Sequence, residues 1–354
     1  MIKNSNSKLQ LTDYVYHNKN ISCFGNYLES VTCYLESSNM DIISKIIQKV
    51  SQENLSKDLF YLSKDPLPCR TLNITLKGHE KCTLYETDDF IKRNLESYGY
   101  QVEKEAVAVQ AFVPDSSVPH GFRKPLPEES WYTAFNLYFK KSGIKYPKDL
   151  IIALAHKDSQ SWLDCAPGAY DNAVGTATVM EIARILAKYK SKRSIWFLFC
   201  NEEHWQWTSV AAAQNIAKLN FNVLTVLNID SIGGKSQQDI SDNKLTNVTR
   251  YSTKEGEKLA DLMAILNEKY QFGLEQTKYF CAKPNDDDGS FIKAGFPASV
   301  LNIGSFPYAD PNYHTVNDKP EYVDLLNVKL ATQLSLAFLV YLDLNGRIDQ
   351  ETIL

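Results

Sequence analysis

Short apolar runs alternate with segments of helical periodicity along the second half of the chain. The runs have the length of strands and occupy residues 150–155, 195–199, 223–229 and 298–303. Helical patterns lie between or after them, at residues 173–189, 210–219, 254–270 and 324–344. Strands that are apolar throughout are typical of parallel sheets covered by helices on both faces. The pattern therefore predicts an α/β fold, with a single three-layer domain built on a largely parallel mixed sheet.

The first part of the chain adds further elements to this domain. A helix followed by a strand is expected within residues 86–109, and the aromatic-rich segment 131–139 alternates as a strand does. The stretch 113–129 is rich in Pro and Ser and is expected to be a loop. Residues 1–66 are polar with short helical patches, so we predict an N-terminal helical extension packed on a main domain of residues 67–354.

Composition and charge exclude several classes of protein. The 354 residues are 44% hydrophobic and 23% charged, as in ordinary globular domains. A net charge of −4 leaves no basic surplus to neutralise phosphates, so no nucleic-acid partner is expected. No run approaches the length of a membrane span, and the N-terminus has no apolar signal segment. We therefore expect no membrane partner and predict a cytoplasmic location, with secretion after removal of a signal segment as the open alternative.

The cysteines are scattered along the chain. Seven are present and none forms a CxxC pair, so a zinc ribbon is not expected. An odd number does not close into a disulfide framework. Free thiols in a reducing compartment are the expectation.

Histidine and carboxylate side chains follow each of the four apolar runs. In chain order these residues are His156, Asp158, Glu202, Glu203, Asp230 and His314. A seventh, Asp171, lies in the turn PGAYDNAVG between the first strand and its helix, at the position of a helix N-cap. Neighbouring parallel strands place their carboxyl ends at one edge of the sheet, and ligands bind there. The sequence therefore predicts that these side chains converge.

A cluster of this composition requires a counter-charge. Lys157 is the only Lys or Arg at these strand ends. Imidazole and carboxylate ligands without thiolate suit zinc, and manganese or cobalt less well. Asp171, Asp230, Glu203 and a bridging hydroxide would carry four negative charges, which two divalent cations balance. We therefore predict two metal ions per chain.

Each residue taken alone has a simpler explanation. A lone histidine after a strand is more often a hydrogen-bonded loop or core residue, Asp171 alone is a good N-cap, and the Glu202–Glu203 pair alone fits a solvated loop start. Their joint occurrence at consecutive strand ends favours a metal site. His204 has no partner in this pattern and is expected at the surface or behind the ligands.

Five motifs carry a resemblance to a known family. HKD, PGAYDN, NEE, NID and YHTVND, in this order, resemble the zinc exopeptidases of the bacterial aminopeptidase type, which include glutamate carboxypeptidase and glutaminyl cyclase. The similarity runs from Thr71 to the C-terminus. It implies a zinc exopeptidase fold and five zinc ligands in all: His156 and Asp230 on one zinc, Glu203 and His314 on the other, and Asp171 between them. It also implies that Asp158 orients the imidazole of His156 and that Glu202 is the general base.

The chain departs from the family pattern beside the site. The segment after the glutamates reads HWQWTS where the family often has Gly-Leu-x-Gly-Ser, and a family histidine is replaced by Asp288. Packing beneath the site is an equal alternative to pocket lining for the two tryptophans. The candidates for the substrate pocket are Trp205, Trp207, Asp288 and Tyr313.

Three functions remain open at this point. The first is a two-zinc aminopeptidase that releases N-terminal residues from peptide substrates. The second is a glutaminyl-peptide cyclase with one zinc, and the third is a catalytically inactive binding protein on the same fold. The resemblance favours the aminopeptidase, because the turn PGAYDNAVG is closer to the peptidase form and all predicted ligands are present.

Overall fold

The computed structural model describes residues 42–347 of the chain. The chain divides into two compact units, Met1–Ile42 and Ile43–Leu354, and the sheet, helices and site described below belong to the second. Most of the predicted N-terminal extension lies outside the described residues and stays a prediction. Residues 43–66 belong to the second unit, where helix α2 (Gln52–Ser63) packs against helices of the main domain.

One mixed sheet forms the centre of this unit. The strands of the described chain are β1 (Val102–Ala111), β2 (Val113–Pro114), β3 (Phe122–Arg123), β4 (Trp131–Lys141), β5 (Tyr146–His156), β6 (Arg193–Cys200), β7 (His204–Trp205), β8 (Asn222–Ile229), β9 (Thr246–Tyr251), β10 (Glu275–Phe280) and β11 (Ser299–Ile303). Nine of them, within the described residues, pair in the order β10-β9-β11-β8-β5-β6-β4-β1-β7. β2 and β3 form a separate hairpin.

Parallel pairing is concentrated at the centre of the sheet. β11, β8, β5 and β6 are parallel to their neighbours in this group, and β10 is parallel to β9. The β9–β11, β6–β4, β4–β1 and β1–β7 pairs are antiparallel. The predicted mixed sheet is thus confirmed, and its parallel centre is the part that the four apolar runs indicated.

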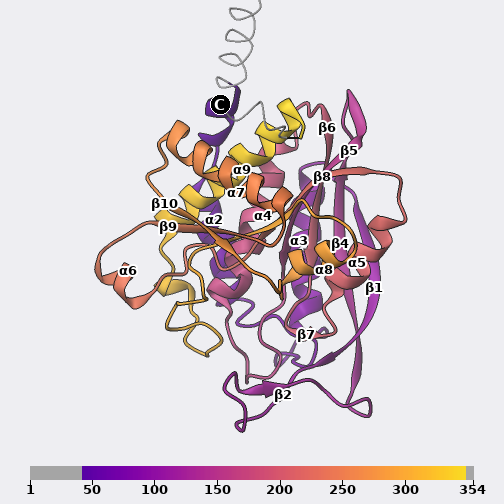
Figure 1. Cartoon of the computed structure of the whole chain (residues 1–354). Helices are drawn as coiled ribbons and strands as arrows, with labels where there is room; N and C mark the ends of the chain where they lie inside the picture. Colours follow the sequence, from indigo (N-terminus) through magenta and orange to yellow (C-terminus); the bar gives the residue numbers. More distant parts are fainter. Residues whose placement is uncertain (1–41, 348–354) are drawn as a thin grey trace, which may run out of the picture. The chain divides into compact units, whose positions relative to one another are not determined.

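Helices cover both faces of the sheet. Residues 42–47 are helical. The further α-helices of the described chain are α2, α3 (Thr83–Ser97), α4 (Val174–Leu186), α5 (Thr208–Ala217), α6 (Gln237–Ser241), α7 (Lys254–Tyr270), α8 (Asp287–Lys293) and α9 (Leu325–Asn345). α2, α3, α4, α7 and α9 lie on one face, and α5 and α8 lie on the other (Figure 1). This arrangement confirms the predicted three-layer α/β fold.

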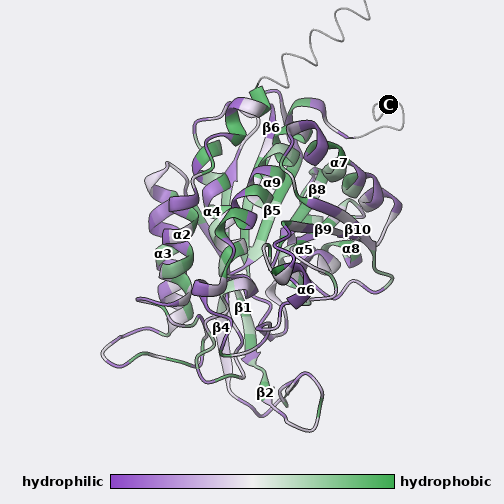
Figure 2. Ribbon diagram, turned by 90° about the vertical axis from the view of Figure 1, so that its left-hand side faces the viewer, coloured by the Kyte–Doolittle hydropathy of each residue, from purple (hydrophilic) through white to green (hydrophobic). Residues whose placement is uncertain are grey.

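The central strands divide their side chains between two cores. In β5, Ile151, Ala153 and Ala155 pack into the core under α4 and α9. The alternate residues of the same strand pack into the core under α5 and α8. Because successive side chains of a strand point to opposite faces, a strand covered on both sides must be apolar at every position. Figure 2 shows these strands as hydrophobic segments between the helices.

Elements at the margins of the sheet were not predicted. Strand β10, with the sequence EQTKYF, lies at the sheet edge and is mostly exposed, so it needs no apolar run. The predicted loop 113–129 contains the short strands β2 and β3. Helix α8 begins with acidic residues and is seven residues long, too short for a clear helical period.

Helix α9 is apolar around its whole circumference. It is 21 residues long, its most apolar 18-residue window has a mean hydropathy of 1.5, and within the described residues it is the one helix long and apolar enough to cross a membrane. Its most apolar window is 72% buried inside the fold, against α2, α4, α7 and β5. A helix that is apolar all round is one that the protein buries on every side.

A disulfide joins Cys69 to Cys165, so the expectation that all cysteines are free thiols is wrong for this pair. Cys82, Cys200 and Cys281 are free, and the two remaining cysteines lie outside the described residues. Disulfides are typical of oxidising compartments. The cytoplasmic location stays a prediction, and this bond does not favour it.

Replacing Cys69 and Cys165 by Ala is expected to destabilise the protein by about 2–4 kcal/mol, because the bond closes a loop spanning 96 positions and limits the unfolded chain. Urea unfolding under non-reducing conditions measures the change. Cys281→Ala, which removes a free thiol, is the control and should change stability by less than about 0.5 kcal/mol. Equal stability of the double variant and the native chain would show that the bond does not form.

Candidate metal centre

The predicted ligands meet at the carboxyl end of the parallel strands. His156 is the last residue of β5, Asp230 follows β8 directly, and Glu203 lies in the turn after β6. The other two come from loops. Asp171 precedes α4, and His314 belongs to the long connection between β11 and α9. His156 and His314 lie more than 150 residues apart in the chain, yet both contact one carboxylate.

Asp171 lies between the two histidines. Its Oδ1 is 3.0 Å from His156 Nε2, and its Oδ2 is 2.9 Å from His314 Nε2. A second carboxylate lies near each histidine. Asp230 Oδ1 is 3.5 Å from His156 Nε2. Glu203 Oε1 is 3.3 Å from His314 Nε2. A carboxylate with one oxygen toward each imidazole has the geometry of a bridging ligand.

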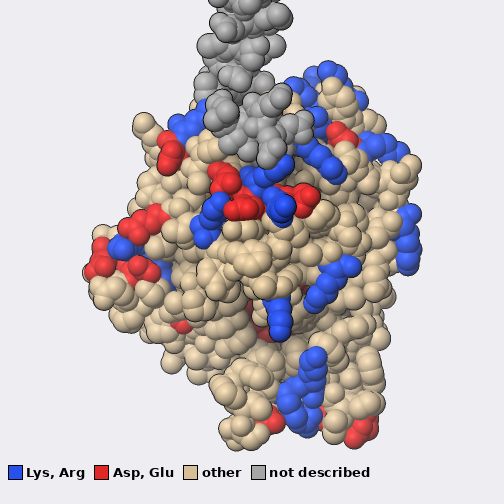
Figure 3. All heavy atoms as spheres, viewed as in Figure 1, with Lys and Arg blue, Asp and Glu red and all other residues tan. Residues whose placement is uncertain are grey.

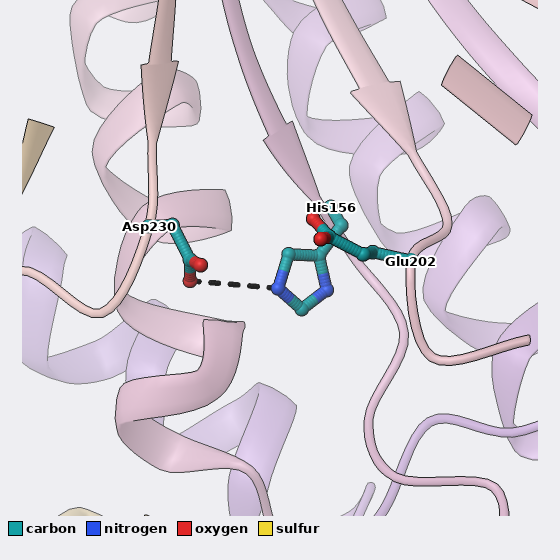
Figure 4. Close-up of side chains that lie close together, drawn as sticks. All are labelled: His156, Glu202 and Asp230. Carbon is teal, nitrogen blue, oxygen red and sulfur yellow. Dashed lines mark ion pairs between the residues drawn. The ribbon is translucent and has the colours of Figure 1, made fainter. Parts of the chain in front are cut away.

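Two sets of potential ligand atoms are compact. The atoms of His156, Glu202 and Asp230 lie within 4.8 Å of one another, and so do those of His156, Asp171 and Glu203. Figure 4 shows the first set converging from three strand ends, with the His156–Asp230 contact drawn as a dashed line. His314 joins the second set through its contacts with Asp171 and Glu203.

Asp158 contacts His156 and the backbone of both glutamates. Its Oδ1 is 3.2 Å from His156 Nδ1 and accepts a 2.9 Å hydrogen bond from the Glu202 amide, and its Oδ2 accepts one of 2.9 Å from the Glu203 amide. With Nδ1 donating to Asp158, the lone pair of His156 Nε2 faces Asp171 and Asp230, as metal binding requires. Burial raises the pKa of Asp158, but the contacts with His156 and His204 outweigh burial and lower it strongly.

His204 is buried, so the surface alternative for this residue is wrong. Its Nδ1 lies 2.8 Å from Asp158 Oδ2, and its Nε2 accepts a 3.2 Å hydrogen bond from the Leu72 amide. Since the amide is the donor, Nε2 carries the lone pair and Nδ1 carries the proton given to Asp158. The other alternative, a position behind the predicted ligands, is where the structure places His204, in contact with the same Asp158 that accepts from the Glu202 and Glu203 amides.

Asn172, and not Asp171, caps helix α4. The Asn172 Oδ1 accepts a 2.9 Å hydrogen bond from the Gly175 amide, and its Nδ2 donates to the Ile229 carbonyl at the end of β8. A Cβ at position 175 would lie 2.2 Å from Asn172 Oδ1 and 2.3 Å from the Ile229 oxygen, so only glycine fits. The predicted N-cap role of Asp171 is therefore wrong, and its carboxylate is left free for the site.

A buried ion pair supports the strand ends. Lys157, between His156 and Asp158, extends its Nζ to Asp88 Oδ1 at 2.9 Å and to Asn201 Oδ1 at 2.7 Å. The side chains of both charged residues are almost fully buried. Lys157 therefore points away from the carboxylate cluster and does not neutralise it.

The cluster is electrostatically strained without a cation. Burial, followed by the charges of Asp286 and Asp287, raises the pKa of Glu202 well above its usual value. Burial and then Asp171 raise the pKa of Glu203 to about 7. Burial lowers the pKa of His314, but Glu203 and Asp171 outweigh burial and raise it to about 10. Divalent cations relieve such crowding, so the donor set fits metal ions.

Glu202 differs from the other carboxylates of the site. Its Oε2 is buried and has no hydrogen-bond partner among the described residues. Buried polar atoms are nearly always paired, so an unpaired carboxylate oxygen beside a ligand cluster marks a place for a polar group from outside the chain. This is the position that a general base needs.

An aromatic cavity of about 490 Å³ opens above the cluster. Trp205, Trp207 and Tyr313 line it, whereas Asp288 lies outside the lining and is fully buried, with its Oδ1 2.7 Å from an Arg250 nitrogen. The structure thus does not place Asp288 in the pocket, where Asp286 faces instead. Sequence reasoning also missed lining residues from other segments, among them Phe112, Phe122, Lys124 and Lys293.

The fold is that of the zinc-exopeptidase-like α/β proteins, and the sequence comparison identifies the family. The profile of Peptidase family M28 matches residues 136–339, more than half of the chain, and the chain belongs to this family. A "probable zinc metalloprotease" of Pyrenophora teres f. teres is 28% identical over 206 residues, 55% of this chain and 40% of that protein. "Leucine aminopeptidase 1" of Metarhizium robertsii is 29% identical over 199 residues, 53% of this chain and 50% of that protein. The chain thus spans about half the length of these relatives or less.

Solved structures share the fold. The Legionella pneumophila LapA aminopeptidase superimposes with a TM-score of 0.64 at 20% identity, covering 88% of this chain and 76% of that one. The glutaminyl cyclase of Tannerella forsythia also has a TM-score of 0.64, at 15% identity, with 82% and 98% covered. At these identities the superpositions establish the fold and leave the choice between hydrolysis and cyclisation to the chemistry of the site.

Proposed function

We propose that this chain is an aminopeptidase that binds two zinc ions and releases N-terminal residues from peptides. The observation that carries the proposal is the position of Asp171, whose two oxygens lie 3.0 and 2.9 Å from the Nε2 atoms of two different histidines. Membership of family M28 supports peptide hydrolysis. The names of the relatives support zinc and aminopeptidase activity.

The zinc ligands follow from the contacts of the two histidines. His156 and Asp230 would hold one zinc, Glu203 and His314 the other, and Asp171 would bridge them. When bound, zinc would act as a Lewis acid on the peptide carbonyl and on water. Asp158 keeps the lone pair of His156 Nε2 toward the site. It also accepts hydrogen bonds from the backbone amides of Glu202 and Glu203, which hold the backbone of both residues in place.

Glu202 would serve as the general base. Its buried, unpaired Oε2 can accept the proton of the attacking water and pass it to the leaving amine. The aromatic walls of the cavity would bury the substrate's side chains and exclude bulk water from this transfer.

Hydrolysis of a small peptide panel tests the proposal. The zinc-loaded chain should release the first residue from peptides with a free amino terminus, should not cleave the same peptides after N-acetylation, and should lose activity with a chelator and regain it with zinc. Cleavage of the acetylated peptides at equal rate would contradict aminopeptidase activity. Binding of zinc without turnover of any peptide would point to an inactive binding protein.

The fold shared with glutaminyl cyclases gives the second candidate. A cyclase would convert an N-terminal glutamine to a ring and release ammonia, and would bind one zinc per chain. A peptide that begins with glutamine therefore separates the two activities, because the aminopeptidase releases free glutamine and the cyclase leaves the peptide chain intact.

A further inference from the structure

Two lysines that line the cavity lack a carboxylate partner. Lys124 and Lys293 are both exposed and both border the cavity above the metal centre. Within the described residues neither forms an ion pair with Asp or Glu. Figure 3 shows Lys and Arg side chains beside a hollow in the middle of this face, with carboxylate groups visible inside it.

Apart from Glu202, the acidic groups of the cavity have a partner in the chain or are predicted zinc ligands. Asp286 pairs with Arg250 and lies 2.7 Å from the Tyr308 hydroxyl through its Oδ1. The other carboxylates of the lining are the predicted zinc ligands and Glu202. Once two zinc ions balance the ligands, Glu202 is the lining carboxylate left without a partner, and it is buried. At the exposed part of the lining, the ammonium groups of Lys124 and Lys293 have no carboxylate beside them within the described residues.

Contacts with aromatic rings hold Lys124 in a defined place. Its Nζ lies 3.8 Å from the centre of the Trp205 ring, a favourable cation–π distance. Nearby in the chain, Phe122 stacks on Trp162 with ring centres 3.9 Å apart, and Trp162 meets His314 edge-on at 5.1 Å. The segment that carries Lys124 is therefore anchored on a predicted zinc ligand.

The lysines lie at the exposed part of the cavity lining, and the proposed function would place the scissile bond at the buried cluster. The ligands of the cluster are buried, apart from the partly exposed His314, whereas Lys124 and Lys293 are exposed. If the N-terminal residue of a peptide reaches the cluster, the leaving part of the peptide extends toward the exposed part of the lining. One extended residue spans about 3.3–3.6 Å, so the first residues beyond the scissile bond come to lie near the lysines.

We propose that Lys124 and Lys293 bind a carboxylate on the leaving side of the peptide. The preferred substrates are then di- and tripeptides, whose free C-terminal carboxylate lies just beyond the scissile bond. Peptides with Asp or Glu at the second or third position present the same group. This specificity rests on the proposed aminopeptidase activity, and it gives the aromatic and basic residues of the cavity separate tasks: the rings bind the side chains and the lysines bind the charge.

Matched dipeptides test the proposal. For the zinc-loaded chain, kcat/KM for Leu-Phe should exceed that for Leu-Phe amide by about tenfold at low salt, and the ratio should fall as ionic strength screens the lysines. In the Lys124→Gln/Lys293→Gln double variant the ratio should approach one, because KM for the free acid rises. In Lys124→Glu/Lys293→Glu it should invert in favour of the amide.

The control is Lys148→Gln. This residue lies at the opposite end of β5, with its Nζ over the Phe221 ring, and its loss should leave the ratio unchanged. Equal kcat/KM for acid and amide in the native chain, or an unchanged ratio in both double variants, would overturn the lysine proposal and leave the aminopeptidase activity standing. If the native chain hydrolyses neither dipeptide, the proposed function fails and this inference fails with it.

Discussion

Glu202→Gln is expected to lower kcat by about 10²–10⁴-fold while the zinc content stays that of the native chain. Within the described residues, the Nε2 atoms of His156 and His314 form ion pairs with Asp171, Asp230 and Glu203 and none with Glu202. The Oε2 of Glu202 is unpaired. The amide of Gln has nearly the same shape but cannot take a proton from water. Elemental analysis and steady-state kinetics on the same preparation measure both quantities.

Glu203→Gln is the matched comparison, because the same change is made one residue away. Glu203 Oε1 lies 3.3 Å from His314 Nε2, so this variant should lose zinc together with activity. Similar zinc loss in both variants would contradict the separate roles of base and ligand. A Glu202→Gln variant with activity near that of the native chain would remove Glu202 from the mechanism altogether.

Asp171→Asn is expected to reduce zinc binding at both sites at once and to abolish measurable turnover. The carboxylate contacts His156 through one oxygen and His314 through the other, so one substitution affects both predicted sites. Removing one partner of a buried charged contact costs about 3–5 kcal/mol. Converted to a ratio of dissociation constants, this free energy lowers zinc affinity by at least about 100-fold. Zinc titration with a competing chelator measures the change.

The control for this variant is Asp164→Asn, the same change at an exposed position of the loop that precedes Asp171. It should bind zinc and turn over peptides as the native chain does. If Asp171→Asn instead loses one zinc and keeps the other with native affinity, Asp171 is a ligand of one site and does not bridge.

The centre of the fold was predictable because burial on both faces leaves a local signal. β5, β6, β8 and β11 are apolar over most of their length because both of their faces are buried, and such runs are visible in the sequence without knowledge of the partners. β10 and α8 carry no such signal, since an exposed edge strand and a helix of two turns are stabilised by the strands and helices beside them. Their positions depend on contacts between segments far apart in the chain.

The ligand set was predictable for a related reason. Parallel strands bring their carboxyl ends to one edge, so a His or Asp directly after an apolar run has a known location. The pocket was less predictable. Asp288 and Asp286 are two residues apart in one short acidic run, and which of them faces the cavity is decided by the contacts of both with Arg250.

The supporting contacts were hidden because they join distant segments. The Leu72 amide that fixes the tautomer of His204 is 132 positions away, and the Cys69–Cys165 bond spans 96. The cap of α4 was assigned to the wrong neighbour, since Asp and Asn are about equally good caps. The hydrogen bonds of Asn172 to Ile229, at the end of β8, and to the Ser231 amide orient its side chain toward the Gly175 amide at the start of α4.

Zinc stoichiometry tests the central claim most directly: that one carboxylate and two distant histidines assemble a site for a pair of cations. The chain should be purified without metal, titrated with zinc, and its bound zinc measured by elemental analysis. We expect two zinc ions per chain, with hydrolysis that needs zinc. Saturation at one zinc per chain would contradict the paired site, and no tight zinc binding at all would contradict the metal centre.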